Sequence, residues 1–312
     1  MSIQQQQLIN LFLLLLLGSF FSNVYLSWWE MGIVLLFTFV FDVTVGCRPR
    51  LHRQNKYQQL NLFQMFLTRC SRGLRPTIPF SSLSTAIGVM LMMVSTHLYI
   101  YLIVIALALL QKHYLQINGQ HFFNPSNFAL IMALLLFYDD AHIVLGQLGD
   151  EYWLALILGL LAIIILIRVN RWLISLFFTL FYLLFQYLFV VGFDPMLIMD
   201  EVYHRFFSIS FILFILFMLT DPRTTPSKSF LQLIFAFLVA LLAVGLDSFY
   251  GFRVQHIFLS LFLFSLFTPL VEQWKYKEKK DLMNVTFFLF VLATVAIIFI
   301  ENQTPYYFTM ES

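Results

Sequence analysis

The sequence predicts an all-α membrane protein, a polytopic bundle of about ten or eleven spanning helices. Of its 312 residues, 61% are hydrophobic and 11% are charged, whereas soluble domains are about 45–50% apolar and about 25% charged. Apolar runs approaching the roughly 20 residues that a bilayer-spanning helix needs recur along the whole chain. No soluble domain is visible, so we expect residues 1–312 to form a single integral membrane domain.

The polar breaks between apolar runs divide the chain into eleven candidate spans, with soft boundaries. Two of the runs, 82–94 and 128–137, look too short to cross fully. Such broken segments are typical of binding sites built from half-helices near the midplane, although helix tilt or a thin local bilayer is the alternative explanation. The candidate spans are 8–26, 28–47, 80–94, 97–111, 123–138, 153–168, 173–192, 206–220, 230–246, 254–270 and 285–300.

The distribution of basic residues predicts the orientation of these spans. The loop 48–79 is rich in arginine, which places it in the cytoplasm by the positive-inside rule. With alternating spans, only Arg205 and Arg253 of the 18 Lys and Arg residues then lie outside. The N-terminus is expected in the cytoplasm and the C-terminus outside a plasma membrane. The middle of the loop is either an amphipathic surface helix or an ordinary loop.

The composition also limits the other partners of the chain. Cys47 and Cys70 both map to the reducing cytoplasmic side, so we expect no disulfide. The histidines form no H-x-x-x-H or similar cluster, so no metal site is predicted. The lipid bilayer is the expected environment, and no nucleic acid is expected as a partner.

Two short polar stretches contain proline beside apolar runs: FNPSN at 123–127 and TDPRTTP at 220–226. In each, an Asn or Asp precedes a proline, which suits the first turn of a helix because its missing N–H costs nothing there. The Asn or Asp side chain caps such a start, and the free N–H groups favour an anion. We therefore predict a helix start at each stretch, with both starts meeting at one polar site.

Two further polar positions have simpler explanations. Asp42 lies inside the second span, where a carboxylate is costly and is by default a functional candidate. Pairing with Arg48, or with an arginine of the following loop, is the interpretation favoured here. Asp247, Tyr250 and Arg253 cluster at the outer end of a span, where interfacial anchoring suffices.

Three motifs in order resemble the NqrB/RnfD family. QKHYLQINGQHFFNPSN carries Lys112, His113, Gly119, His121 and the Phe-Asn-Pro at 123–125. TDPRTT carries Thr220, Asp221, Pro222 and Thr224, and LFTPLVE carries Pro269 and Glu272. The resemblance covers about 75–272, which leaves 1–47 as extra N-terminal helices and 282–301 as an extra C-terminal helix.

This resemblance implies a membrane subunit of a sodium-pumping NADH:quinone reductase or Rnf-type electron-transport complex, with redox-coupled ion transport. It also implies two structural repeats with broken helices. The family's Ser-Gly-Ala-Thr type motif, which carries a covalent flavin, does not occur here, and residues 138–153 contain no Ser or Thr. We therefore expect no covalent flavin, and any FMN or riboflavin would be held non-covalently.

The candidate cofactor-binding residues follow from the same motifs. Arg223 and the neighbouring hydroxyls suit a phosphate or an ion, while a cap and a positive-inside anchor are the alternative. The amides of Asn124 and Asn127 suit a flavin edge or a solute, or they satisfy backbone groups at a helix break. The candidates are Lys112, His113, His121, Asn124, Ser126, Asn127, Thr220, Asp221, Arg223, Thr224 and Thr225.

Two other functions stay open from the sequence. The same polar break suits a channel or transporter for a small solute, without redox chemistry. Similar family members without the attachment motif occur in enediyne biosynthetic gene clusters. The third hypothesis is therefore an accessory membrane protein of a biosynthetic pathway. Whether the chain takes part in catalysis as a subunit of a membrane oxidoreductase is left open.

Overall fold

The fold is an α-helical bundle, as the sequence predicts. The computed structural model describes residues 2–21, 24–52, 79–117, 120–144, 152–191, 202, 208–272 and 279–303. Each of the eleven candidate spans contains a helical segment, in the expected order. The α-helices are α1 (Ile3–Phe21), α2 (Trp28–His52), α4 (Phe80–Met92), α5 (Leu98–Tyr114), α6 (Pro125–Leu136), α7 (Tyr152–Val169), α8 (Trp172–Phe185), α10 (Ile209–Leu213), α11 (Ser229–Tyr250), α12 (Gln255–Ser265), α13 (Thr268–Glu272) and α14 (Lys279–Gln303).

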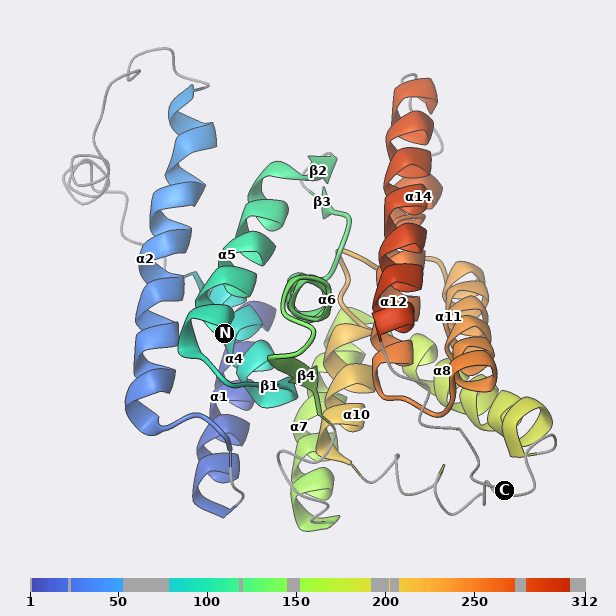
Figure 1. Cartoon of the computed structure of the whole chain (residues 1–312), viewed down its shortest axis with the longest axis horizontal. Helices are drawn as coiled ribbons and strands as arrows, with labels where there is room; N and C mark the ends of the chain where they lie inside the picture. Colours follow the sequence, from blue (N-terminus) through green and yellow to red (C-terminus); the bar gives the residue numbers. More distant parts are fainter. Residues whose placement is uncertain are drawn as a thin grey trace.

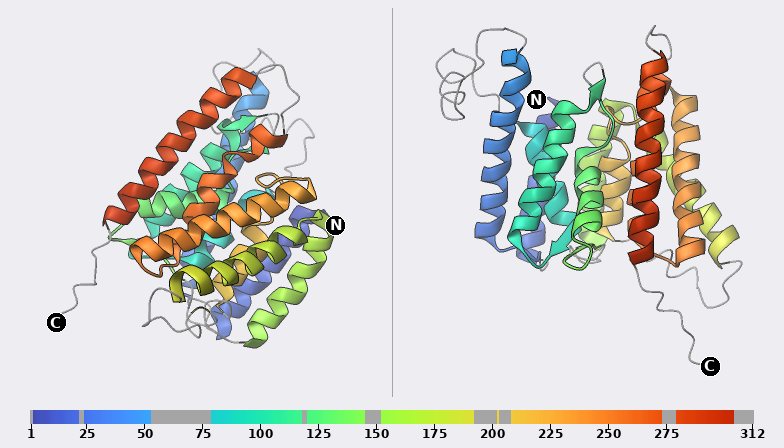
Figure 2. Two further views of the ribbon diagram at one scale, coloured as in Figure 1. Left: turned by 90° about the vertical axis from the view of Figure 1, so that its right-hand side faces the viewer. Right: turned by 45° about the horizontal axis from the view of Figure 1, so that its top comes forward.

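Most of the long helices run roughly side by side, as expected for a membrane bundle (Figures 1 and 2). Helix α4 packs against α1, α2 and α6, while α11 packs against α8 and α12. Helix α14 lies against α12 and α6. Helices α6 and α12 contact each other directly and so connect the earlier and later parts of the chain.

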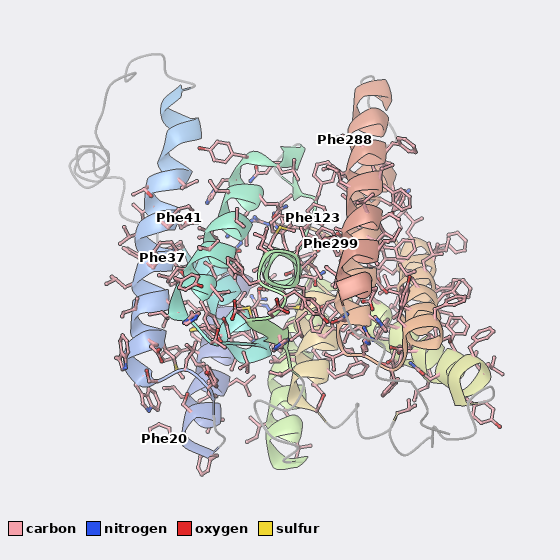
Figure 3. The ribbon with its side chains drawn as sticks, in the orientation of Figure 1. Phe20, Phe37, Phe41, Phe123, Phe288 and Phe299 are labelled. Carbon is pink, nitrogen blue, oxygen red and sulfur yellow. The ribbon has the colours of Figure 1, made fainter. Side chains whose placement is uncertain are left out.

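Several helices are long and apolar enough to cross a bilayer. Among the described residues these are Ile3–Phe21, Trp28–Val45, Trp172–Phe189 and Ser229–Tyr250. Phenylalanines cover the outside of the bundle, as with Phe20 and Phe288, which are 72% and 62% exposed (Figure 3). Phe123 instead lies in the core, with its ring stacked 4.4 Å from that of Phe262. Proteins surrounded by water rarely expose so many aromatic rings, because contact of apolar surface with water is unfavourable. The chain is therefore a membrane protein.

The two segments expected to be short are short in the structure. Helix α4 has 13 residues and α6 has 12, which at 1.5 Å per residue is about 18–20 Å, less than the roughly 30 Å hydrocarbon core. Two short strands follow them, β1 (Met93–Ser95) and β4 (Ala141–Ile143), and pair antiparallel. The strands β2 (Gln116–Ile117) and β3 (Gln120–His121) form a second ribbon before α6. The start of α6 lies in the interior, where Pro125, Ser126 and Asn127 are buried.

Two π-helical segments interrupt the second half of the bundle. Segment η1 (Gln186–Val191) continues α8, and η2 (Phe214–Met218) continues α10. Such π segments occur often at functional sites because the wider turn displaces side chains and carbonyls from their regular positions. Here each one lies next to a buried polar cluster, as described below.

Several sequence predictions lie outside the described residues. They include the proposed amphipathic helix within 48–79, Cys70, and Arg205. The orientation, the two structural repeats, and the division into a family core with extra terminal helices stay predictions.

Candidate functional site

The FNPSN stretch begins helix α6 as predicted. Asn124 has extended backbone angles, and its Oδ1 accepts hydrogen bonds from the N–H groups of Ser126 and Asn127 at 3.0 and 3.2 Å. Pro125 occupies the first helical turn. This is the N-cap arrangement that the sequence predicts, since a short polar side chain satisfies N–H groups that have no partner within the helix.

The TDPRTTP stretch does not begin a helix, which corrects the prediction. Helix α11 begins at Ser229, and Asp221 instead closes a turn: its Oδ1 accepts the N–H of Arg223 at 3.1 Å. The hydroxyl of Thr225 also donates to the Asp221 carbonyl at 2.6 Å. A second proline, Pro226, explains the difference, because a helix starting at Pro222 would place it in the interior, where it lacks an N–H and disfavours the helical region for the residue before it.

The two stretches nevertheless meet. Asn124 Nδ2 lies 3.3 Å from Asp221 Oδ2 and 3.4 Å from the carbonyl oxygen of Met218, the last residue of η2. His121 Nε2 lies 3.8 Å from the same Asp221 oxygen, and the His121 side chain is only 2% exposed. The start of α6 and the end of η2 are therefore joined through one carboxylate.

The charge of Asp221 is favoured by its neighbours. Burial by itself raises the pKa of this carboxyl, but His121, the Arg223 N–H and the Arg223 guanidinium outweigh burial and hold the pKa below its usual value. Asp221 is therefore an anion at neutral pH, and it presents hydrogen-bond acceptors only.

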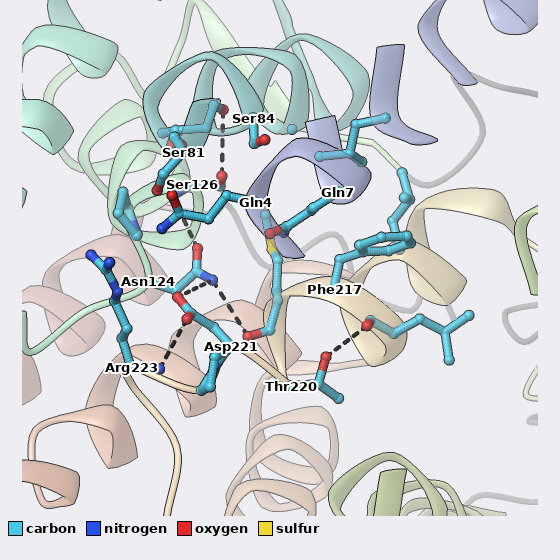
Figure 4. A pocket seen from close by; sticks show the side chains of 18 of the residues that line it. Gln4, Gln7, Ser81, Ser84, Asn124, Ser126, Phe217, Thr220, Asp221 and Arg223 are labelled. Carbon is cyan, nitrogen blue, oxygen red and sulfur yellow. Dashed lines mark hydrogen bonds between the residues drawn. The ribbon is translucent and has the colours of Figure 1, made fainter. Parts of the chain in front are cut away.

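A cavity of about 100 Å³ lies beside this contact. Its polar walls come from α1, α4, the start of α6 and the loop after η2 (Figure 4). Gly88 of α4 lies so close to α6 that an added Cβ would approach Ser126 Oγ to 3.0 Å. The polar side chains lining the cavity are Gln4, Gln7, Ser81, Ser84, Thr85, His121, Asn124, Ser126, Thr220, Asp221 and Arg223.

Six of the eleven sequence candidates line this cavity, and five do not. Asn127 donates to the Phe258 carbonyl of α12 at 3.0 Å and so connects α6 to α12. The Thr224 carbonyl accepts from Thr268 at 2.8 Å, and Thr225 holds the turn at Asp221. These contacts fix the elements that build the cavity. The remaining two, Lys112 and His113, belong to a neighbouring network.

That network contains Asp42, whose described partners differ from the prediction. Asp42 Oδ1 accepts from Ser82 Oγ at 2.6 Å and lies 2.8 Å from His113 Nε2. Lys112 Nζ, which is buried, donates to the same Ser82 hydroxyl at 2.7 Å. The expected partner Arg48 has a side chain outside the described set, so that pairing stays a prediction. Ser82 and His113 come from helices remote in sequence, which local reasoning does not find.

Sequence reasoning also missed part of the cavity wall. Gln4 and Gln7 come from the polar N-terminal run, and Ser81 and Ser84 begin α4. The cluster of hydroxyl residues in FSSLST was the available signal, because such residues are sparse in the apolar spans. The glutamines have no motif, and only the packing of α1 against α4 brings them here.

Comparison with known proteins finds one family, which matches part of the chain. The model of the NQR2, RnfD, RnfE family matches residues 136–280, just under half of the chain. The matched range contains the Asp221 turn and both Pro269 and Glu272, and it begins after the Asn124 motif. No curated protein matches the chain. Over residues 136–280 the chain is therefore similar to the NQR2, RnfD, RnfE family, and these residues lie in a bundle of membrane helices.

Proposed function

We propose that this protein is a membrane-embedded electron-transfer subunit that binds a flavin non-covalently, as FMN or riboflavin, at the Asn124–Asp221 cavity. The observation that carries the proposal is the convergence of the α6 start and the Asp221 turn on one polar cavity. The match of residues 136–280 to the NQR2, RnfD, RnfE family supports the same class of subunit. A bound flavin supplies one- and two-electron chemistry that protein side chains lack.

The lining residues suit the polar edge of a flavin ring, which alternates carbonyl and N–H groups. Asp221 offers a carboxylate acceptor for a ring N–H, while Ser126 and the glutamines of α1 offer both donors and acceptors. Arg223 lines the same cavity and suits a carbonyl oxygen or a phosphate. These groups are the ones expected to hold and orient the ligand.

The volume of the cavity does not fit the whole ring system. A site that encloses a drug-sized ligand measures about 300–1,000 Å³, against about 100 Å³ here. The cavity in this conformation has room for one polar edge and not for three fused rings. We therefore derive no electron-transfer step through it, and the proposal concerns binding.

A second candidate function follows from that volume. About 100 Å³ suits a small polar solute or a hydrated ion, since a liquid water molecule occupies about 30 Å³. A channel or transporter on the same fold would use Asn124 and Asp221 as solute contacts. Uptake of a small solute into liposomes, by protein that carries no flavin, would support this second function over the first.

Electron transfer requires a donor and an acceptor, so the proposal includes partner subunits of a membrane redox complex. Redox-coupled ion transport and a plasma-membrane location belong to the proposal on family grounds. The absence of Ser and Thr from 138–153 supports non-covalent binding over attachment at that loop.

The first test is the flavin content of purified full-length protein. We expect a flavin absorption spectrum, complete release of the flavin on acid denaturation, and no flavin mass added to the peptide containing 138–153. Asn124→Ser keeps an N-cap oxygen but removes the amide donor, so it should lower flavin content while leaving the fold intact. Asp139→Asn, which changes an exposed carboxylate outside the cavity, is the matched control.

Two results would contradict the proposal. One is wild-type protein without flavin that also fails to take up added riboflavin or FMN. The other is equal flavin content in wild type and Asn124→Ser, which would place any flavin elsewhere.

A further inference from the structure

A second buried polar cluster lies where α11, α12 and α14 meet. Its centre consists of Asp247 of α11, His256 of α12 and Glu301 of α14, whose side chains are 0% exposed. Sequence reasoning explained Asp247 as an interfacial anchor, which is wrong because the side chain is buried. An anchor needs contact with the aqueous boundary.

The histidine lies between the two carboxylates. His256 Nδ1 is 2.6 Å from Asp247 Oδ1, and His256 Nε2 is 3.3 Å from Glu301 Oε2. The Nε2 atom is fully buried and makes no hydrogen bond with good geometry to the described residues. Both ring nitrogens therefore face carboxylate oxygens.

Other contacts hold both oxygens of each carboxylate. Gln186 of η1 donates to Asp247 Oδ2 at 2.6 Å, and Tyr182 of α8 lies 3.4 Å from the same oxygen. Arg253, in the turn between α11 and α12, donates through its backbone N–H to Asp247 at 3.1 Å and through its guanidinium to Glu301 at 3.2 Å. Gln255 donates to Glu301 Oε1 at 2.6 Å. These donors keep both carboxylates in place beside the imidazole.

Both ring nitrogens of His256 face an acceptor oxygen, so the cluster suits a ring with two N–H groups, whereas a neutral histidine has one. A neutral imidazole carries one N–H, so its second nitrogen would direct a lone pair at a carboxylate oxygen. The two carboxylates and the Arg253 guanidinium sum to one negative charge, which a proton on His256 neutralises. An uncompensated charge is costly in a membrane interior. We propose that Asp247, His256 and Glu301 form a proton-binding site in which imidazolium lies between two carboxylates.

The surroundings of His256 are consistent with this site. The titratable or charged groups seen to face it are Asp247 from α11, Tyr182 from α8, Arg253 from the turn and Glu301 from α14. Two uncharged groups contact Phe258, in the same part of α12. They are the amide of Asn127 from α6 and the ring of Phe214 from η2. The side chain of Arg253 is 24% exposed. Its contact with Glu301 therefore places one edge of the buried cluster at the protein surface.

The site is separate from the Asn124–Asp221 cavity and does not depend on the function proposed for it. It is nevertheless connected to the start of α6, because Asn127 binds the carbonyl of Phe258, two residues after His256. The wide turn of η1 also begins at Gln186, which contacts Asp247. The ligand assigned to this second cluster is a proton.

The test is NMR of full-length protein in lipid nanodiscs, with ¹⁵N-labelled histidine, titrated from about pH 6 to 9. We expect both ring nitrogens of His256 to be protonated at neutral pH and to titrate reversibly. Asp247→Asn and Glu301→Gln each remove one stabilising negative charge, so each should lower the proton affinity of the ring by at least about tenfold. Asp139→Asn is the matched control and should leave it unchanged.

The His256 signal is assigned by its loss in His256→Gln. If that variant does not fold, the signal is the one that moves in both carboxylate variants and not in the control. A neutral His256 across the whole range would overturn the proposal, and so would a protonated ring unaffected by either carboxylate variant. Replacement of potassium by sodium at constant pH should not move the signal, and displacement of the proton by sodium would make this a metal-cation site instead.

Discussion

Gly88→Leu is expected to destabilise the bundle strongly and to close the candidate cavity. A Cβ added at this position would lie 3.0 Å from Ser126 Oγ and 3.4 Å from Ser126 Cβ, both on α6. A leucine must therefore push the two helices apart, and overpacking of this kind costs about 1–3 kcal/mol. Gly88 also lines the cavity, so the added side chain takes up the space proposed for the ligand.

The measurement is the temperature at which detergent-solubilised protein loses its monodisperse elution, together with flavin content. Gly159→Leu in α7 is the matched control, because an added Cβ there meets nothing within 4 Å. Equal thermal stability and equal ligand content in the two variants would contradict the close approach of α4 and α6.

Asp221→Ala is expected to destabilise the candidate site by removing its central carboxylate. The carboxylate accepts from Arg223 and Asn124 and lies next to buried His121. Its removal takes this partner from the buried Asn124 amide, and the loss of a partner by a buried donor costs about 1–3 kcal/mol. Because the folded-state pKa of Asp221 is lowered, this stabilisation is present above the ordinary value of 3.8 and is lost as the pH falls further.

The thermal midpoint of Asp221→Ala at neutral pH, compared with that of exposed Asp139→Ala, measures this effect. We expect a clear loss for Asp221→Ala and a change within about 0.5 kcal/mol for the control. Identical midpoints for the two variants would show that the Asp221 contacts contribute no stability.

The helices were predictable because bilayer thickness dictates the length of an apolar run. The short spans α4 and α6 were predictable for the same reason, as was the Asn124 cap, which depends only on neighbouring residues. The paired strands after α4 and α6 could not be predicted. Strands β1 and β4 have three residues each, and the paired residues are more than forty positions apart in the sequence. Periodicity has no meaning over so short a stretch.

The site was predictable where contacts are local and unpredictable where they are not. Asn124 and Asp221 were singled out from their motifs, and their contact follows from the fold. The Asn-Pro and Asp-Pro pattern alone predicts a helix at Pro222, whereas Pro226, four residues later, favours the observed turn. Asp247 was misjudged because its partners His256 and Glu301 depend on the packing of α11, α12 and α14, which no local pattern reveals.

The central claim is that the Asn124 and Asp221 stretches build one ligand site, and a double-mutant cycle on riboflavin affinity tests it most directly. The variants are Asn124→Ser, which keeps the cap oxygen, and Asp221→Asn, which keeps the size of the side chain. Because the two side chains touch and would share the ligand, the losses in binding free energy should be non-additive by about 0.5–3 kcal/mol. Losses that add to within about 0.3 kcal/mol in folded variants, or riboflavin affinity unchanged by both, would contradict a shared site and leave the two stretches as independent structural elements.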